Sequence, residues 1–106
     1  MRPDFGVVES QLLELAKQVR LAGSPARLFQ EFIDHGEYGL ALEELGIGLY
    51  SHGRAPSENE LSAFRRIAVA MSQDAEEYLR DARVRAQRVT ANEVGSTSEG
   101  DRFDNS

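Results

Sequence analysis

FIDHGEYGLALEEL, residues 32–45, combines the end of one helix, the start of another and a cluster of carboxylates. His35 and Gly36 predict the helix end, because glycine adopts the left-handed backbone that closes a helix without steric cost. Glu37 is placed to begin the next helix, where its negative charge interacts favourably with the positive end of the helix dipole. The stretch therefore predicts two helices joined by a tight turn.

Upstream of this stretch, apolar residues recur every three or four positions, which is the spacing of an amphipathic helix. The pattern predicts a helix over residues 5–22 that is stopped by Gly23. Ser24 is expected to cap the next helix, with Pro25 in its first turn, where the missing N–H costs nothing. A short helix with an apolar stripe then leads to His35.

The helix that starts near Glu37 is expected to run to about His52. Its predicted buried face consists of residues spaced four, three and four apart: Tyr38, Leu42, Leu45 and Leu49. Its interior also contains three glycines: Gly39, Gly46 and Gly48. Each glycine costs about 1 kcal/mol relative to alanine in an exposed helix. We expect another backbone to approach this helix closely, either from a neighbouring helix or from a partner.

Two capping signals predict further helices. Ser57 and Glu60 form a capping box that begins a fourth helix, in which side chain and backbone satisfy each other's hydrogen bonds. Asp74 and Glu77 repeat the same spacing for a fifth helix. Within the fifth helix, the i,i+4 spacing predicts two ion pairs: Glu76 with Arg80, and Asp81 with Arg85.

The expected fold is all-α, a compact bundle of four to five short helices. A chain of 106 residues has room for one modest core, and we assign the helical domain to residues 1–89. Residues 90–106 are predicted to form a disordered acidic tail, because they contain too few apolar residues to offset the entropy lost on ordering.

Negative charge is concentrated in the middle of the chain. Residues 31–60 hold seven acidic groups against Arg54 alone, a balance of −6 that equals the net charge of the whole protein. Such a field attracts basic proteins and repels nucleic-acid phosphates. Six arginines follow in residues 61–89, but four acidic residues interrupt them, which is typical of an ion-paired, solvated face. We therefore expect no nucleic-acid partner.

No enzyme signature accompanies this charge. His35 and His52 lack the spacing of a metal site, and the sequence contains no nucleophile elbow and no phosphate-binding loop. The adjacent Glu43 and Glu44 point about 100° apart on a helix, so they do not converge as an acid/base pair. The protein is expected to be no enzyme and to bind no metal and no cofactor. Without cysteine, a secretory signal or a long apolar run, we expect a cytoplasmic protein that does not enter membranes.

The helix from Glu37 to Tyr50 also carries apolar residues on its second face, among them Leu40 and Ile47. One interpretation is a protein-binding surface, in which apolar anchors give affinity and carboxylates steer the partner. The other is a central helix that is buried on two sides, with its glutamates reaching water at the edges. Burial is the simpler expectation for Leu40 and Ile47.

The segment EFIDHGEYGLALEEL, followed by Tyr50 and the capping box SENEL, resembles the small immunity proteins of bacterial polymorphic toxin systems, in particular the MafI type. In that family, a similar F-I-x-x-x-E-Y-x-L-A-x-E-x-L core joins two helices of a compact α-helical domain. The resemblance extends over about residues 10–80. It implies a cytoplasmic protein that binds the toxic C-terminal domain of a cognate secreted effector and blocks it stoichiometrically.

Toxins of these systems are often nucleases, and a nuclease has a basic substrate groove that an acidic inhibitor can occupy. We expect four charge contacts and two apolar anchors at this interface: Asp34, Glu37, Glu43 and Glu44, with Ile47 and Tyr50. The alternative is a helical adaptor or regulatory module that binds a basic segment of another protein. Because both functions predict the same acidic surface, charge does not separate them.

Overall fold

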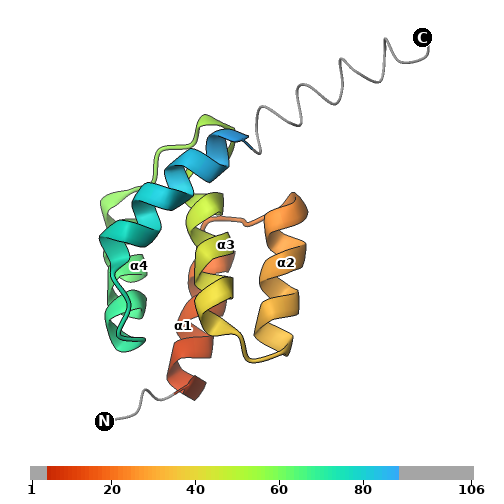
Figure 1. Cartoon of the computed structure of the whole chain (residues 1–106), viewed down its shortest axis with the longest axis vertical. Coiled ribbons are helices and arrows are strands. Elements are labelled where there is room, and N and C mark those ends of the chain that lie inside the picture. Colours follow the sequence, from red (N-terminus) through yellow and green to blue (C-terminus); the bar gives the residue numbers. More distant parts are fainter. Residues whose placement is uncertain (1–4, 89–106) are drawn as a thin grey trace, which may run out of the picture.

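A computed structural model of the protein describes residues 5–88, and these residues form helices and connecting loops without a strand. The predicted all-α bundle is confirmed (Figure 1). Its elements are α1 (Phe5–Gln18), α2 (Gly23–Asp34), α3 (Tyr38–Tyr50), the short 3₁₀ helix η1 (Ser51–Gly53), α4 (Glu58–Ala70) and a fifth helix over residues 75–88. The segment predicted as a tail lies outside the described residues.

The central element of the bundle is α3, which packs against α1, α2 and α4 (Figure 1). Leu42, Leu45 and Leu49 are completely buried, as their spacing predicted. Tyr38 is only half-buried, because its hydroxyl reaches the edge of α1 and donates a 2.7 Å hydrogen bond to Glu9. The fifth helix runs obliquely to the other helices and contributes Leu79 to the same core.

The first helix ends earlier than the sequence predicted. It stops at Gln18 because Arg20 adopts a left-handed backbone with φ of 55°, and the N–H of Leu21 then donates to the carbonyl of Ala16 at 3.1 Å. The reversal turns the Leu21 side chain back onto the bundle, where it packs against the core. The helix is therefore ended by Arg20, which is not a glycine, and not by Gly23, on which the prediction depended.

The start of α2 also differs from the prediction. The helix begins at Gly23 instead of after Ser24, and its N-cap residue is Ala22, whose side chain cannot accept a hydrogen bond. By contrast, the turn between α2 and α3 follows the sequence signal. Gly36 has φ of +71°, and the N–H of Glu37 donates to the carbonyl of Phe32 at 2.8 Å. This pattern closes α2 as predicted.

The glycines of α3 accommodate neighbouring side chains. A Cβ atom at Gly46 would lie 3.0 Å from the Cβ of Ala82 in the fifth helix and 3.4 Å from the Phe64 ring. At Gly48 a Cβ would collide with the Leu21 side chain. The expected close approach is thus present, but at both positions the nearest atoms belong to side chains, not to the backbone of another element.

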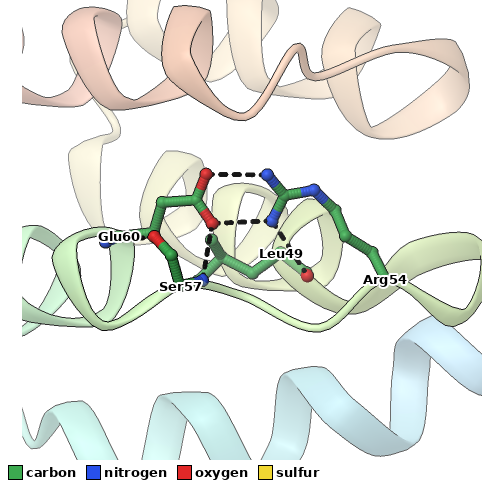
Figure 2. Close-up of polar contacts among 4 residues, drawn as sticks. All are labelled: Leu49, Arg54, Ser57 and Glu60. Carbon is green, nitrogen blue, oxygen red and sulfur yellow. Dashed lines mark hydrogen bonds and ion pairs between the residues drawn. The ribbon is translucent and has the colours of Figure 1, made fainter.

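The capping box at the start of α4 is confirmed and is part of a larger polar cluster (Figure 2). The N–H of Glu60 donates to the Ser57 hydroxyl at 3.1 Å, and the N–H of Ser57 donates to the Glu60 carboxylate at 3.0 Å. Arg54 donates two parallel hydrogen bonds to the same carboxylate, at 2.8 and 2.7 Å, and a third of 3.4 Å to the carbonyl of Leu49. Arg54 thereby links the end of α3 to Glu60 at the start of α4.

These donors act on the ionisation of Glu60. The hydrogen bonds from Arg54 lower the pKa of the Glu60 carboxyl more than burial raises it, and the N–H of Ser57 lowers the pKa further. A carboxyl whose pKa is lower in the folded state stabilises the fold when ionised. This stabilisation is complete above the ordinary pKa of glutamate and is lost as the pH falls through the folded-state pKa.

The substitution Glu60→Gln is expected to lower the free energy of unfolding at pH 7 by about 2 kcal/mol, because it weakens the cap and removes the charge-assisted pair with Arg54. Urea unfolding measures the effect. The gap between the two proteins should narrow as the pH is lowered through the acidic range, where the native carboxyl is also protonated. Glu58→Gln, an exposed change in the same turn, should cost less than about 0.5 kcal/mol. Equal losses at both positions would contradict this assignment.

Candidate protein-binding surface

Two of the six expected contact residues lie fully at the surface, beside the turn between α2 and α3. Asp34 ends α2, and its carboxylate accepts a 2.9 Å hydrogen bond from the Gln30 amide. Glu37 is the exposed N-cap residue of α3. The charges of both residues are accessible to a partner.

Glu43 is half-buried and has an internal role. Its carboxylate accepts a 3.1 Å bond from Arg85 of the fifth helix, and Arg85 also lies 3.7 Å from Asp81, one turn earlier. The Asp81–Arg85 pair was predicted from i,i+4 spacing. The prediction for Glu76 was wrong: its carboxylate accepts a 2.7 Å hydrogen bond from Arg65 of α4 instead of pairing with Arg80.

Glu44 and Ile47 lie on the face of α3 that the fifth helix approaches. Ile47 is 3% exposed and packs with Ala82 and Ala86, so it belongs to the core of this protein and is not an exposed anchor. Glu44 is 7% exposed. Burial raises the pKa of Glu44; Arg85 opposes the shift, and the neighbouring Glu43 adds to it. Neither residue offers the exposed contact that the sequence suggested.

The remaining predicted anchor, Tyr50, is half-buried at the end of α3. The guanidinium of Arg83 lies 5.4 Å from the centre of its ring, a cation–π distance. Of the two apolar side chains for which burial was the simpler expectation, Ile47 is buried and Leu40 is not, because Leu40 remains 40% exposed.

The structure reveals an acidic groove that sequence reasoning did not identify. A hollow of about 570 Å³ lies between α3 and the fifth helix, and we call it the acidic groove. Its lining residues are Glu43, Glu77, Tyr78, Arg80, Asp81 and Val84. Three carboxylates and one arginine line the groove, and Arg85 pairs with two of these carboxylates, Glu43 and Asp81. Val84, also in the lining, is 48% exposed. The groove combines negative charge with apolar surface.

The pKa of the Tyr78 hydroxyl is raised in the groove. Burial is the largest cause, and the negative charges of Glu43 and Glu77 add to it. Glu37, Leu40 and Glu43 follow one another at intervals of three along α3, which keeps them on neighbouring parts of one helix surface. The sequence contained a signal for the other wall, because Glu77, Asp81 and Val84 recur at i, i+4 and i+7 on one face of the fifth helix.

Other kinds of site were sought in the part of the chain that the structure describes. No group of three or more histidine, cysteine or acidic side chains within residues 5–88 could hold a metal ion. None of the described helices is long and apolar enough to cross a membrane. His35 lies at the end of α2, with its Nδ1 atom 2.8 Å from the carbonyl oxygen of Glu31, the helix-terminal position that its sequence context indicated.

Comparison of the chain with protein-family models, with curated proteins and with solved structures finds no match.

Proposed function

We propose that this protein is an immunity protein that binds a basic toxin domain, most simply a nuclease, and neutralises it stoichiometrically. The observation that carries the proposal is the acidic groove, in which carboxylates of α3 and of the fifth helix surround exposed apolar surface. Charge at the rim accelerates association with an oppositely charged partner, while apolar contacts give lasting affinity. The resemblance of residues 31–45 to MafI-type proteins supports the same function.

The mechanism follows from electrostatics. A nuclease holds its substrate by lysine and arginine side chains that contact phosphates. Carboxylates of the groove and of the turn, including Glu77, Asp81 and Glu37, would pair with those side chains in place of phosphate. Bound substrate and bound inhibitor would then exclude each other, either by overlap in the active site or by contacts beside it. No catalytic step by this protein is required.

The proposal is tested with the reading frame immediately adjacent to the gene for this protein. Expression of that frame alone should be toxic, expression of both should restore growth, and the two products should purify as a complex that high salt weakens. A harmless neighbour that forms no complex would overturn the immunity function. It would leave the adaptor function, for which pull-down from whole lysate with an intact and a charge-reversed groove is the next experiment.

A further inference from the structure

A second hollow, of about 370 Å³, lies between α1 and α4, which are not the helices that line the acidic groove. Its apolar lining includes Leu15 and Ile67, which belong to the core and are each 1% exposed. Glu14 lines the hollow from α1 and Arg66 lines it from α4, and both of these side chains are exposed. One acidic and one basic group therefore stand on opposite walls of one hollow.

Three polar groups of this hollow lack a partner within residues 5–88. Glu14 and Arg66 form no ion pair or hydrogen bond there, with each other or with any other described residue. Gln11 lies one turn before Glu14 on the same face of α1, and its buried Oε1 atom accepts no hydrogen bond. A buried acceptor without a donor is destabilising, so the hollow favours an occupant that brings a donor.

Exposed apolar side chains continue the surface along both helices. Val7 lies one turn before Gln11 on α1 and is 52% exposed, and Val69 lies one turn after Arg66 on α4 and is 73% exposed. We use the name α1–α4 face for this surface, which consists of Val7, Gln11, Glu14, Arg66 and Val69. The face combines apolar area with one negative and one positive charge, which sum to zero.

We propose that the α1–α4 face pairs with the same face of a second copy of this protein. A face with an acid and a base on opposite walls of a hollow is complementary to itself. A two-fold axis through the hollow places Glu14 of each copy opposite Arg66 of the other. The guanidinium of Arg66 has five N–H donors, which can serve both the Glu14 carboxylate and the orphaned Gln11 Oε1 of the other copy. The same contact removes Val7 and Val69 from water.

The charges of the face select this occupant over others. A basic partner would be opposed by Arg66, an acidic partner or a nucleic acid would be opposed by Glu14, and an apolar partner would leave both charges unpaired. A second copy satisfies both at once. The net charge of −6 opposes contact between copies through the acidic groove and keeps the association weak.

The inference does not depend on the proposed function, because the toxin is assigned to the acidic groove on other helices. A change at Glu14 that separates the two copies therefore leaves toxin binding intact. Loss of the dimer would not reject the immunity function, and a harmless gene neighbour would not reject the dimer.

Sedimentation velocity of the full chain at increasing concentration tests the inference. The native protein is expected to show a monomer–dimer equilibrium. Glu14→Arg alone and Arg66→Glu alone should each weaken the dimer about tenfold, because like charges then face each other. The double variant, Glu14→Arg with Arg66→Glu, should restore the dimer. An equimolar mixture of the two single variants should form a heterodimer, since each copy then carries the charge that the other lacks.

Matched controls make the same charge changes on α2, which does not line the hollow: Glu31→Arg and Arg27→Glu. Both controls should dimerise like the native protein. A native chain that stays monomeric at millimolar concentration would overturn the inference. Single variants that dimerise as well as the controls, or a mixture that stays monomeric, would overturn it too. Circular dichroism establishes that each variant is folded.

A measurement on the native protein needs no variant. In ¹⁵N-labelled full chain, the amide signals of Gln11, Glu14 and Val69 should shift as the concentration rises, whereas those of Glu77 and Asp81 should stay constant. Shifts confined to the acidic groove would place the contact between copies there and would reject the α1–α4 face.

Discussion

The substitution Gly46→Leu is expected to lower the free energy of unfolding by about 3 kcal/mol, near the upper end of typical overpacking effects. The position has no free volume, because even a Cβ atom would lie 3.0 Å from the Cβ of Ala82 and 3.4 Å from the Phe64 ring. Phe64 is completely buried, and Ala82 is 3% exposed on the fifth helix, so neither can move without disturbing the core. Leucine is a good helix former, and a loss would therefore report packing instead of helix propensity.

A graded series isolates the cause. Gly46→Ala should destabilise by about 1 kcal/mol, since the methyl group still meets Ala82. Gly39→Ala is the matched control on the same helix: its Cβ would meet only the Tyr78 hydroxyl, at an ordinary distance of 3.6 Å. There the gain in helix propensity should stabilise by up to about 1 kcal/mol. Urea unfolding of the three variants would contradict the packing of the fifth helix on α3 if Gly46→Leu unfolded like the native protein.

The second large effect concerns partner binding. Reversal of two charges in the acidic groove, Glu77→Lys with Asp81→Lys, is expected to weaken the toxin complex by about 100-fold, mainly through slower association. Both side chains are exposed, Asp81 at 63%, so the fold should survive the change. Binding kinetics at low and high salt measure the effect, which should diminish as salt screens the rim charges.

The control for this reversal is Glu14→Lys, which makes the same change of charge at an exposed position of α1. It should leave the affinity within about threefold of the native value, whereas Glu77→Lys alone should cost about tenfold. Similar losses at the two positions would show that only net charge matters and would reject the groove as the interface. Circular dichroism and the unfolding midpoint establish that each variant is folded.

The structure also changes which residues are suitable for such a test. From sequence alone, reversal of Glu43 and Glu44 was the natural experiment, since both were expected at the surface. The structure shows that Glu43 holds Arg85 of the fifth helix and that Glu44 is buried. A lysine at Glu44 would place an unpaired cation in the interior, so any loss of binding would be mixed with a loss of structure. Glu77 and Asp81 are both exposed, and their reversal removes only the 3.7 Å surface pair of Asp81 with Arg85, which contributes little to stability.

Local chemistry made several elements predictable. Gly36 takes the left-handed backbone at the end of α2, Ser57 and Glu60 cap α4, and the apolar side chains of α3 face the core at their helical spacing. Each of these features depends on residues within a few positions of one another, so the sequence displays both partners together. The predicted end of α1 was wrong, because this helix end depends on a tertiary contact. Arg20 adopts a left-handed backbone there, and Leu21 packs on the core.

The sequence by itself determined the helices, most of their boundaries and the concentration of negative charge in residues 31–60. Only the tertiary structure decided which of those charges reach the surface. The fifth helix packs on α3 through Ala82 and Ala86, which buries Ile47 and brings Glu77 and Asp81 beside Glu43 in one groove. The physical reason is that α3 carries apolar residues on two faces, and its own residue spacing does not decide whether the second face is buried. The choice is made by residues more than thirty positions away, whose contact no local spacing encodes.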